Sequence, residues 1–454
     1  MKKSLILLTV AFLGTLGLTS AQEQECRTNL SIYVEYVKTK NYDAAFEPWK
    51  QVYDNCPKMN WANYAYGERI LKHKIKNSSG ADKDGYVQDL IELYKGGLEN
   101  FPNKTNLAKA TINDILTKYD HKMVDTGAVY EGLKYAFDQD YINFKNPKAL
   151  YLMFSSLVDE HKAGRKDLQE VFDVYDQVTT KIEEENNKLT ATITKLLPKE
   201  EAGTLTSKEK RTLKAATVNS QSFGKISGSI DTKLGNLADC ENLIPLYTKN
   251  FEAKKNDVKW VKGAVGRMFA KECTDDPLFI KLFEAQLALD PSAEAYMYGG
   301  SIKQKAGDSK GALADFNKAV ELENDPIKKS NILYKIATIY RKGSKSTARS
   351  YAQKAINANP SNGKAYLLIA SLYAGSANAC GSTPFEKRAI YWKAADMARK
   401  AGRVDPSLSS RAKKSAASYS AKAPTKEMIF NSGMAGKSVT FKCWVGGSVK
   451  VPSL

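Results

Sequence analysis

Histidine is scarce in this chain of 454 residues, which has only His73, His121 and His161. These three residues lie far apart and lack the spacing that brings ligands together around a metal. The six cysteines include no CxxC pair, so neither a zinc site nor a thiol redox motif is indicated. The sequence therefore predicts no metal and no redox cofactor.

Signatures of catalysis are missing as well. No serine lies in a nucleophile-elbow motif. The segment Gly436-Lys437-Ser438 superficially resembles a phosphate loop, but Asn431 occupies the position of the required first glycine. A strand, not the helix that the motif needs, is predicted to follow it. We predict no catalytic residue and no cofactor, and hence a protein that is not an enzyme.

Long apolar runs are absent after the first residues of the chain. Lys2 and Lys3 precede an apolar run, Leu5–Leu18, that is too short to span a bilayer, and small residues up to Ala21 follow it. This pattern predicts a signal peptide, residues 1–21, cleaved near Ala21. Residues 22–25 do not suit lipid attachment at Cys26. We expect a soluble exported protein, in the periplasm or at the cell surface, with no membrane span after cleavage.

Acidic residues are outnumbered, with 50 Asp and Glu against 68 Lys and Arg and a net charge of +18. Removal of the signal peptide lowers this charge by the two units of Lys2 and Lys3. A lysine-rich balance suits an anionic partner, such as a surface polysaccharide, lipid headgroups or an acidic protein. The sequence shows no nucleic-acid recognition motif. The densest basic stretch, Arg399–Lys426, also fits a simple solvated surface.

What the chain does have is a repeat. Between Ala293 and Pro406, an aromatic-rich helical segment is followed three times by an alanine-rich one that ends in a turn. A period in the thirties, with large residues on one helix and small ones on its partner, indicates a solenoid of helical hairpins. Small residues let two helices approach closely, and proline ends the second helix.

These units resemble the tetratricopeptide repeat (TPR). The positions that match its pattern of aromatic, small and proline residues are Tyr296, Gly300, Ala312, Phe316 and Ala319, then Leu333, Ala337, Tyr340, Ala348, Ala355 and Pro360, then Tyr366, Ala370, Tyr373, Ala394, Ala398, Ala401 and Pro406. A weaker copy near the N-terminus carries Tyr36, Ala45, Trp49, Val52 and Pro57. The whole chain also resembles a group of bacterial cell-envelope TPR proteins with a short Cys-Trp tail.

The cysteines predict three structural disulfides in an exported chain, although six cysteines allow 15 pairings and free buried thiols are the alternative. Cys26 begins one predicted helical hairpin and Cys56 ends it, and the two ends of such a hairpin lie close together. Cys240 and Cys273 stand in the same relation. Cys380 and Cys443 are left to pair with each other.

A different pattern occupies the middle of the chain. Leu168, Tyr175, Ile182, Leu189 and Leu196 recur every seven residues, in a segment without glycine or proline. This predicts a long helix with a coiled-coil-like seam. A turn at Pro198–Thr206 precedes a second helix that returns toward Cys240. This hairpin either stands out from the solenoid or packs against it as an oversized repeat.

Together these features predict an all-α fold: a TPR-like α-solenoid of helical hairpins with a long coiled-coil-like hairpin insertion and a small C-terminal β-hairpin. Val439, Phe441 and Cys443 alternate with polar residues and Trp444 before the expected turn at Gly446-Gly447. The expected segments after the signal peptide are N-terminal repeats (22–163), the long hairpin (164–239), C-terminal repeats (240–425) and the β-hairpin tail (426–454).

TPR arrays commonly bind a partner on the face formed by the first helix of each repeat, so the resemblance implies a scaffold that binds a protein or peptide in the cell envelope. The residues expected on that face are Met297, Ser301, Gln304, Lys305, Asn331, Tyr334, Thr338, Arg341, Lys342, Leu367 and Ser371. Met297 and Ser301 occupy the positions of the Lys–Asn clamp of some TPR proteins, so that clamp is not expected. The alternative is a lysine-rich binder of anionic glycan or cell wall.

Overall fold

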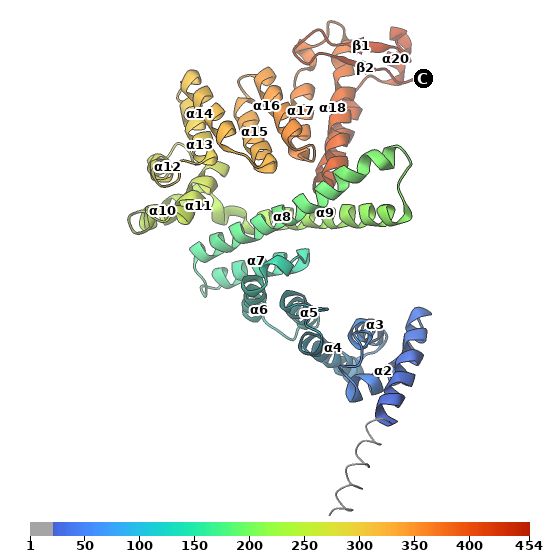
Figure 1. Ribbon diagram of the computed structural model, residues 1–454. Helices are drawn as coiled ribbons and strands as arrows, with labels where there is room; N and C mark the ends of the chain where they lie inside the picture. Colours follow the sequence, from blue (N-terminus) through green and yellow to red (C-terminus); the bar gives the residue numbers. More distant parts are fainter. Residues whose placement is uncertain (1–20) are drawn as a thin grey trace, which may run out of the picture. The chain divides into compact units, whose positions relative to one another are not determined.

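The computed structural model describes residues 21–454, which divide into two compact units, one ending at Asp167 and the other spanning Leu168–Leu454 (Figure 1). The predicted signal peptide lies outside the described residues except for Ala21. Within residues 21–454, no helix is long and apolar enough to cross a membrane.

The first unit is built of consecutive antiparallel helices. Residues 21–38 are helical. The helices that follow are α2 (Tyr42–Asn55), α3 (Ala62–Asn77), α4 (Gly80–Asn100), α5 (Leu107–Asp120), α6 (Thr126–Gln139) and α7 (Pro147–Lys162), with a short 3₁₀ helix η1 (Tyr141–Asn143) before α7. Several of them begin at an Asn or Asp whose side chain accepts a hydrogen bond from a first-turn amide, as at Asn106 and Asp125.

Trp49 lies at the centre of the packing at the N-terminal end of this unit. Its side chain is fully buried, and its indole N–H donates to the carbonyl oxygen of Asn63 at 2.7 Å. The Asn63 side chain accepts from the hydroxyl of Tyr33, also at 2.7 Å. Gly67 leaves room for the indole, since a Cβ there would lie 2.7 Å from the ring. Trp49 and Tyr33 therefore belong to a hydrophobic core at this end of the unit.

Glu160 is a buried carboxylate near the C-terminal end of the first unit. It accepts two hydrogen bonds from Arg165, at 2.5 and 2.8 Å, and one from the Thr126 hydroxyl at 2.5 Å. These donors, the Arg165 guanidinium first among them, lower the pKa of Glu160 to about 2.

We expect this network to make the stability of the first unit pH-dependent. Because the folded pKa of about 2 lies below the ordinary value of 4.5, the contribution of Glu160 is fully present above about pH 4.5 and is lost as the pH falls toward 2. Thermal unfolding of the wild type and of Glu160→Gln across this range checks the prediction. The wild type should lose more stability on acidification than the variant, and parallel curves would contradict the assignment.

The second unit begins with the long hairpin and continues as an array of helical pairs. Its helices are α8 (Leu168–Glu201), α9 (Ser207–Leu234), α10 (Cys240–Lys254), α11 (Val258–Ala270), α12 (Pro277–Leu289), α13 (Ala293–Lys305), α14 (Ser309–Leu322), α15 (Pro326–Tyr340), α16 (Lys345–Ala358), α17 (Gly363–Ala374), α18 (Pro384–Val404), α19 (Ser409–Lys422) and α20 (Lys426–Ser432). Short 3₁₀ helices lie at η2 (Gly235–Ala238), η3 (Ala377–Ala379) and η4 (Pro406–Leu408).

The predicted repeats are the pairs α13–α14, α15–α16 and α17–α18. Gly300 of α13 faces Phe316 of α14 so closely that a Cβ at Gly300 would lie 2.5 Å from the ring. The alanines at the small positions of these pairs are fully buried, as Ala312, Ala337 and Ala355 show. Small residues therefore allow the close approach of each pair, and the prediction of a TPR-like α-solenoid is confirmed.

The long hairpin insertion is confirmed as α8 and α9. Its tip has a small core of its own, made by Ile193, Leu196, Leu213 and Ala216. Helix α8 continues through Pro198 to Glu201, four residues beyond the expected end. Pro198 has no N–H to donate to the preceding turn, and the helix ends within one turn after it. The coiled-coil character of the seam stays a prediction.

The C-terminal tail contains the expected β-hairpin in a shorter form. Strands β1 (Ser438–Thr440) and β2 (Ser448–Lys450) pair antiparallel, with Val439 opposite Val449. The first strand was expected to continue to Trp444, but residues 441–447 form a loop instead. Two contacts account for the difference. Cys443 is bonded to Cys380, and side chains of the repeats bind the carbonyl groups of this loop.

All three predicted disulfides are present, namely Cys26–Cys56, Cys240–Cys273 and Cys380–Cys443. The first two each join the ends of one helical hairpin, as expected. The third ties the tail to the connection between α17 and α18. Bridges of this kind typically stabilise a fold by about 2–4 kcal/mol, chiefly by restricting the unfolded chain.

Candidate functional site

The first helices of the three repeats, α13, α15 and α17, contact one another in order and form one face of the array. The predicted partner-binding residues lie on these helices or directly after α15. Their exposure differs widely. Met297 is fully buried and Leu367 is 8% exposed, so both lie in the core of the array and not on a surface that a partner can reach. A middle helix of a solenoid has neighbours on several sides, which leaves only a strip of it accessible.

At the end of α13, Ser301 and Lys305 line a hollow of about 380 Å³ together with Phe279 of α12. Lys305 forms an ion pair with Asp275 and donates to the Thr274 hydroxyl at 3.1 Å. Gln304 is half-buried. The charge of Lys305 is thus already compensated within this hollow.

Three predicted residues, Tyr334, Thr338 and Arg341, recur at helical spacing along one side of α15. Burial raises the pKa of Tyr334, and the positive charges of Arg411 and Arg341 oppose that rise. Arg411 belongs to α19, so positive charges from two segments act on the tyrosine. We call Tyr334, Arg341 and Arg411 the basic docking face.

The cations of this face are exposed and unpaired among the described residues. Arg341 and Arg411 are exposed, and neither has a hydrogen-bond or ion-pair partner within residues 21–454. The same holds for the neighbouring Lys342. Thr338 donates to the carbonyl oxygen of Lys335, and Ser371 of α17 to that of Leu368. Arg411 was not among the predicted residues, because its stretch of sequence resembles an ordinary solvated surface.

Asn331, the remaining predicted residue, has a different role. Its amide donates to Glu183 of α8 at 2.8 Å, which helps to hold the long hairpin on the array. Thr194 and Ser361 bond through their hydroxyls, and Arg403 of α18 pairs with Glu201 at the end of α8. The hairpin therefore packs against the repeats, which decides between the two alternatives left open by the sequence (Figure 1).

The tail is fixed to the array by two cations. Arg349 of α16 donates to the carbonyl oxygens of Trp444 and Val445, both at 3.0 Å, and Lys393 of α18 donates to that of Gly446 at 2.6 Å. Both cations also lie over the ring of Tyr373, at 5.9 and 5.6 Å from its centroid. Burial, aided by the charge of Arg349, lowers the pKa of Lys393. The tail thus covers the last repeat.

We expect Arg349→Met to loosen this tail and to destabilise it by about 1–3 kcal/mol, because two backbone carbonyls lose a charged donor. Hydrogen exchange at the amides of Phe441 and Val451, which bond within the hairpin, measures the effect. Lys354→Met, at an exposed lysine of the same helix, is the control. Unchanged protection in Arg349→Met would show that the disulfide alone holds the tail.

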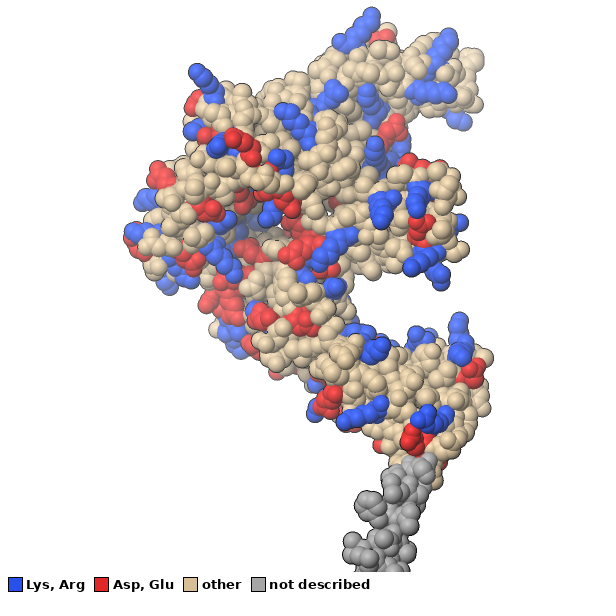
Figure 2. Space-filling view, in the orientation of Figure 1, with Lys and Arg blue, Asp and Glu red and all other residues tan. Residues whose placement is uncertain are grey.

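On the face of the molecule shown in Figure 2, the charged side chains of the second unit form no single dominant patch. Figure 2 shows the lysine and arginine side chains of the second unit scattered over its surface, with acidic side chains between them. Within residues 21–454 there is no cluster of His, Cys, Asp or Glu that could hold a metal. The basic docking face is thus a local feature, made of few residues.

No protein-family model matches the sequence, and no curated protein matches it. Among solved structures, the chain is similar to a tetratricopeptide repeat protein from Parabacteroides merdae, with 15% identity, coverage of 69% of this chain and 98% of that one, and a TM-score of 0.24. It is also similar to yeast Tom70, with 12% identity, coverage of 88% and 96%, and a TM-score of 0.26. With scores this low, the assignment of a TPR-like fold rests on the helical pairs of this chain itself.

Proposed function

We propose that this TPR-like solenoid is an exported, non-enzymatic scaffold that binds an acidic segment of a partner protein in the bacterial cell envelope. The observation that carries the proposal is the basic docking face, where the charges of two exposed cations without partners among the described residues act on Tyr334. Helical-repeat arrays of this kind serve as surfaces for protein–protein interaction. Unpaired guanidinium groups favour carboxylates, which they bind through two parallel hydrogen bonds.

Export is supported by the predicted leader and by the three disulfides, since structural disulfides form in oxidising compartments outside the cytosol. The resemblance of the Cys-Trp tail to that of envelope TPR proteins supports the same location. In the proposed role, the scaffold assembles or stabilises a secretion, surface or outer-membrane complex.

Crosslinking in the native cell, followed by mass spectrometry of the captured proteins, tests this function. The double variant Arg341→Glu/Arg411→Glu should lose a partner that the wild type captures. Lys208→Glu/Lys310→Glu changes the charge equally at exposed lysines of α9 and α14 and should retain the partner. Capture that is equal for both double variants, or absent for the wild type, would reject the proposal.

The alternative function is the binding of an anionic glycan or cell wall through lysine-rich surface. Helix α19 favours it, because its sequence carries four cations and no acidic residue. Binding of this kind should collapse as ionic strength rises and should respond equally to both double variants. Docking of an acidic protein segment should also weaken in salt, but it alone should depend on Arg341 and Arg411 and not on Lys208 and Lys310.

A further inference from the structure

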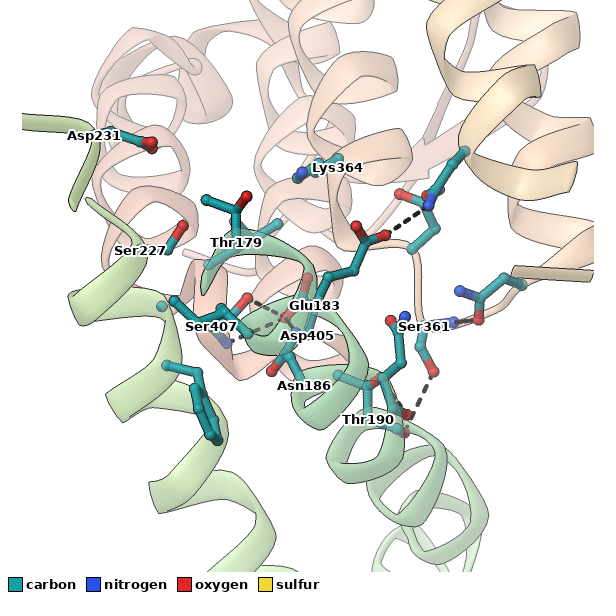
Figure 3. Close-up of a pocket in the computed structure, with 18 of the residues that line it drawn as sticks. Thr179, Glu183, Asn186, Thr190, Ser227, Asp231, Ser361, Lys364, Asp405 and Ser407 are labelled. Atoms are coloured by element: carbon teal, nitrogen blue, oxygen red, sulfur yellow. Dashed lines mark hydrogen bonds between the residues drawn. The ribbon is translucent and has the colours of Figure 1, made fainter. Parts of the chain in front are cut away.

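A polar hollow of about 340 Å³ lies within the second unit, between the long hairpin and the repeat array (Figure 3). Its walls come from α8, α9, the start of α15, the connection between α16 and α17, and the junction of α18 with η4. The volume falls within the range of small-molecule sites, which is about 300–1,000 Å³. These walls are brought together only because the hairpin packs on the repeats.

The carboxylates of the hollow are held in position by hydrogen bonds. Asp405 accepts on Oδ1 from the backbone N–H of Ser407 at 3.2 Å and from the Asn186 amide at 3.4 Å. Asp231 accepts on Oδ1 from the hydroxyl of Tyr175 at 2.9 Å. Glu183 accepts on Oε1 from Asn331, as described above. Each carboxylate is therefore oriented through one of its two oxygens.

The second oxygens of these carboxylates have no donor. Within residues 21–454, Glu183 Oε2, Asp231 Oδ2 and Asp405 Oδ2 accept no hydrogen bond, although Asp405 is only 8% exposed. Burial raises the pKa of Asp405. A group that fills this hollow should therefore be rich in hydrogen-bond donors.

The charge of the hollow opposes that of the whole chain. Its three carboxylates face a single cation, Lys364, which has no ion-pair partner among residues 21–454. Figure 3 shows Lys364 and Asp231 pointing toward the space between them from opposite walls. An acidic hollow in a protein of net charge +18 favours a ligand that carries a positive charge and disfavours an anionic one.

The remaining walls fit a hydroxylated ring. Thr179 and Ser227 present hydroxyls, and Phe223 and Ile182 supply an apolar surface on which the C–H face of a ring can pack. We propose that this hollow binds a small hydroxylated amine of the amino-sugar class. Its ammonium group donates to Asp231, its hydroxyls bond to those of Thr179 and Ser227, and Lys364 donates to a ligand oxygen (Figure 3).

Isothermal titration calorimetry of the mature chain with D-glucosamine tests the site, at a pH where the amine is protonated. Glucosamine should bind more tightly than N-acetylglucosamine, which lacks the charge, and glucuronate should not bind. Asp231→Asn keeps the bond from Tyr175 but removes the charge, and should weaken glucosamine binding by about tenfold or more. Glu200→Gln removes an exposed charge of α8 outside the hollow and should leave the affinity unchanged.

Several results would overturn the assignment. These are no binding of glucosamine, equal affinity for N-acetylglucosamine, binding of spermidine as tight as that of glucosamine, or an equal response to Asp231→Asn and Glu200→Gln. If a glucosamine oligomer binds at least as tightly as the monomer, the result supports the site and indicates that its ligand is the end of a glycan chain. If only the monomer binds, the result supports the site and indicates that its ligand is a free amino sugar. Circular dichroism and thermal unfolding confirm that each variant is folded.

Discussion

Replacing Gly224 with alanine should displace the long hairpin from the repeat array and lower the free energy of unfolding of the second unit by about 3 kcal/mol. Gly224 lies on α9 directly against η4. A Cβ at this position would overlap the carbonyl oxygen of Ser407 and lie 2.6 Å from its carbonyl carbon. Because all of these atoms belong to the backbone, no side chain can rotate away to relieve the clash.

Gly228→Ala is the matched control for this prediction. It lies one turn further along α9, and a Cβ there would meet nothing within 4 Å. Alanine should stabilise the helix at this position by about 0.5–1 kcal/mol, since it restricts the unfolded chain. Urea unfolding measures both changes, and hydrogen exchange along α9 and η4 shows whether the hairpin opens. Equal stability of the two variants would mean that the hairpin is not held as described.

The hairpin shows which parts of the structure the sequence can predict. The repeat positions were predictable because their spacing is local, so that Gly300 and Phe316 belong to one unit of the repeat. The disulfide Cys240–Cys273 followed from the geometry of one hairpin. The bonds that hold α8 on the array could not be predicted in this way. Thr194 and Ser361 are separated by 167 residues, and no periodicity relates them.

The candidate sites were predictable only in part. Helical spacing placed Tyr334 and Arg341 on one side of α15, but it did not show that Met297 would be covered by neighbouring helices. Arg411 was missed because its contribution depends on α19 returning to the same face. The hollow beneath the hairpin draws on five separate segments, and its carboxylates, such as Asp231 and Asp405, carry no motif. Burial and long-range contact are properties of the packed array and not of any one repeat.

A buried arginine joins the hairpin to the helices that follow it, and its loss should have the second large effect. Arg267 of α11 is 8% exposed and lies over the rings of Phe172 and Tyr247, at 5.3 and 5.8 Å from their centroids. Its guanidinium donates to the Tyr247 hydroxyl at 2.5 Å, to the carbonyl oxygen of Phe172 at 3.3 Å and to Asp176. Three helices, α8, α10 and α11, therefore meet at one side chain.

Arg267→Met should destabilise the second unit by about 3 kcal/mol, because it leaves the buried Tyr247 hydroxyl and Phe172 carbonyl without a donor. Burial raises the pKa of Tyr247 to about 12. Its hydroxyl therefore stays neutral near neutral pH, and a change in its ionisation does not offset the lost hydrogen bond. Asp176→Asn should cost only about 1 kcal/mol, since the side chain of Asp176 is 43% exposed and water can replace part of the interaction.

Urea unfolding of the two single variants and of the double variant separates these contributions. If Arg267 acts through the whole network, the double variant should lose less stability than the sum of the two single losses, since both remove the same ion pair. A loss for Asp176→Asn as large as that for Arg267→Met would instead assign the stabilisation to the ion pair alone. The rings and the carbonyl oxygen around the guanidinium would then contribute little, and the contact between α8 and α11 would depend on a partly solvated charge.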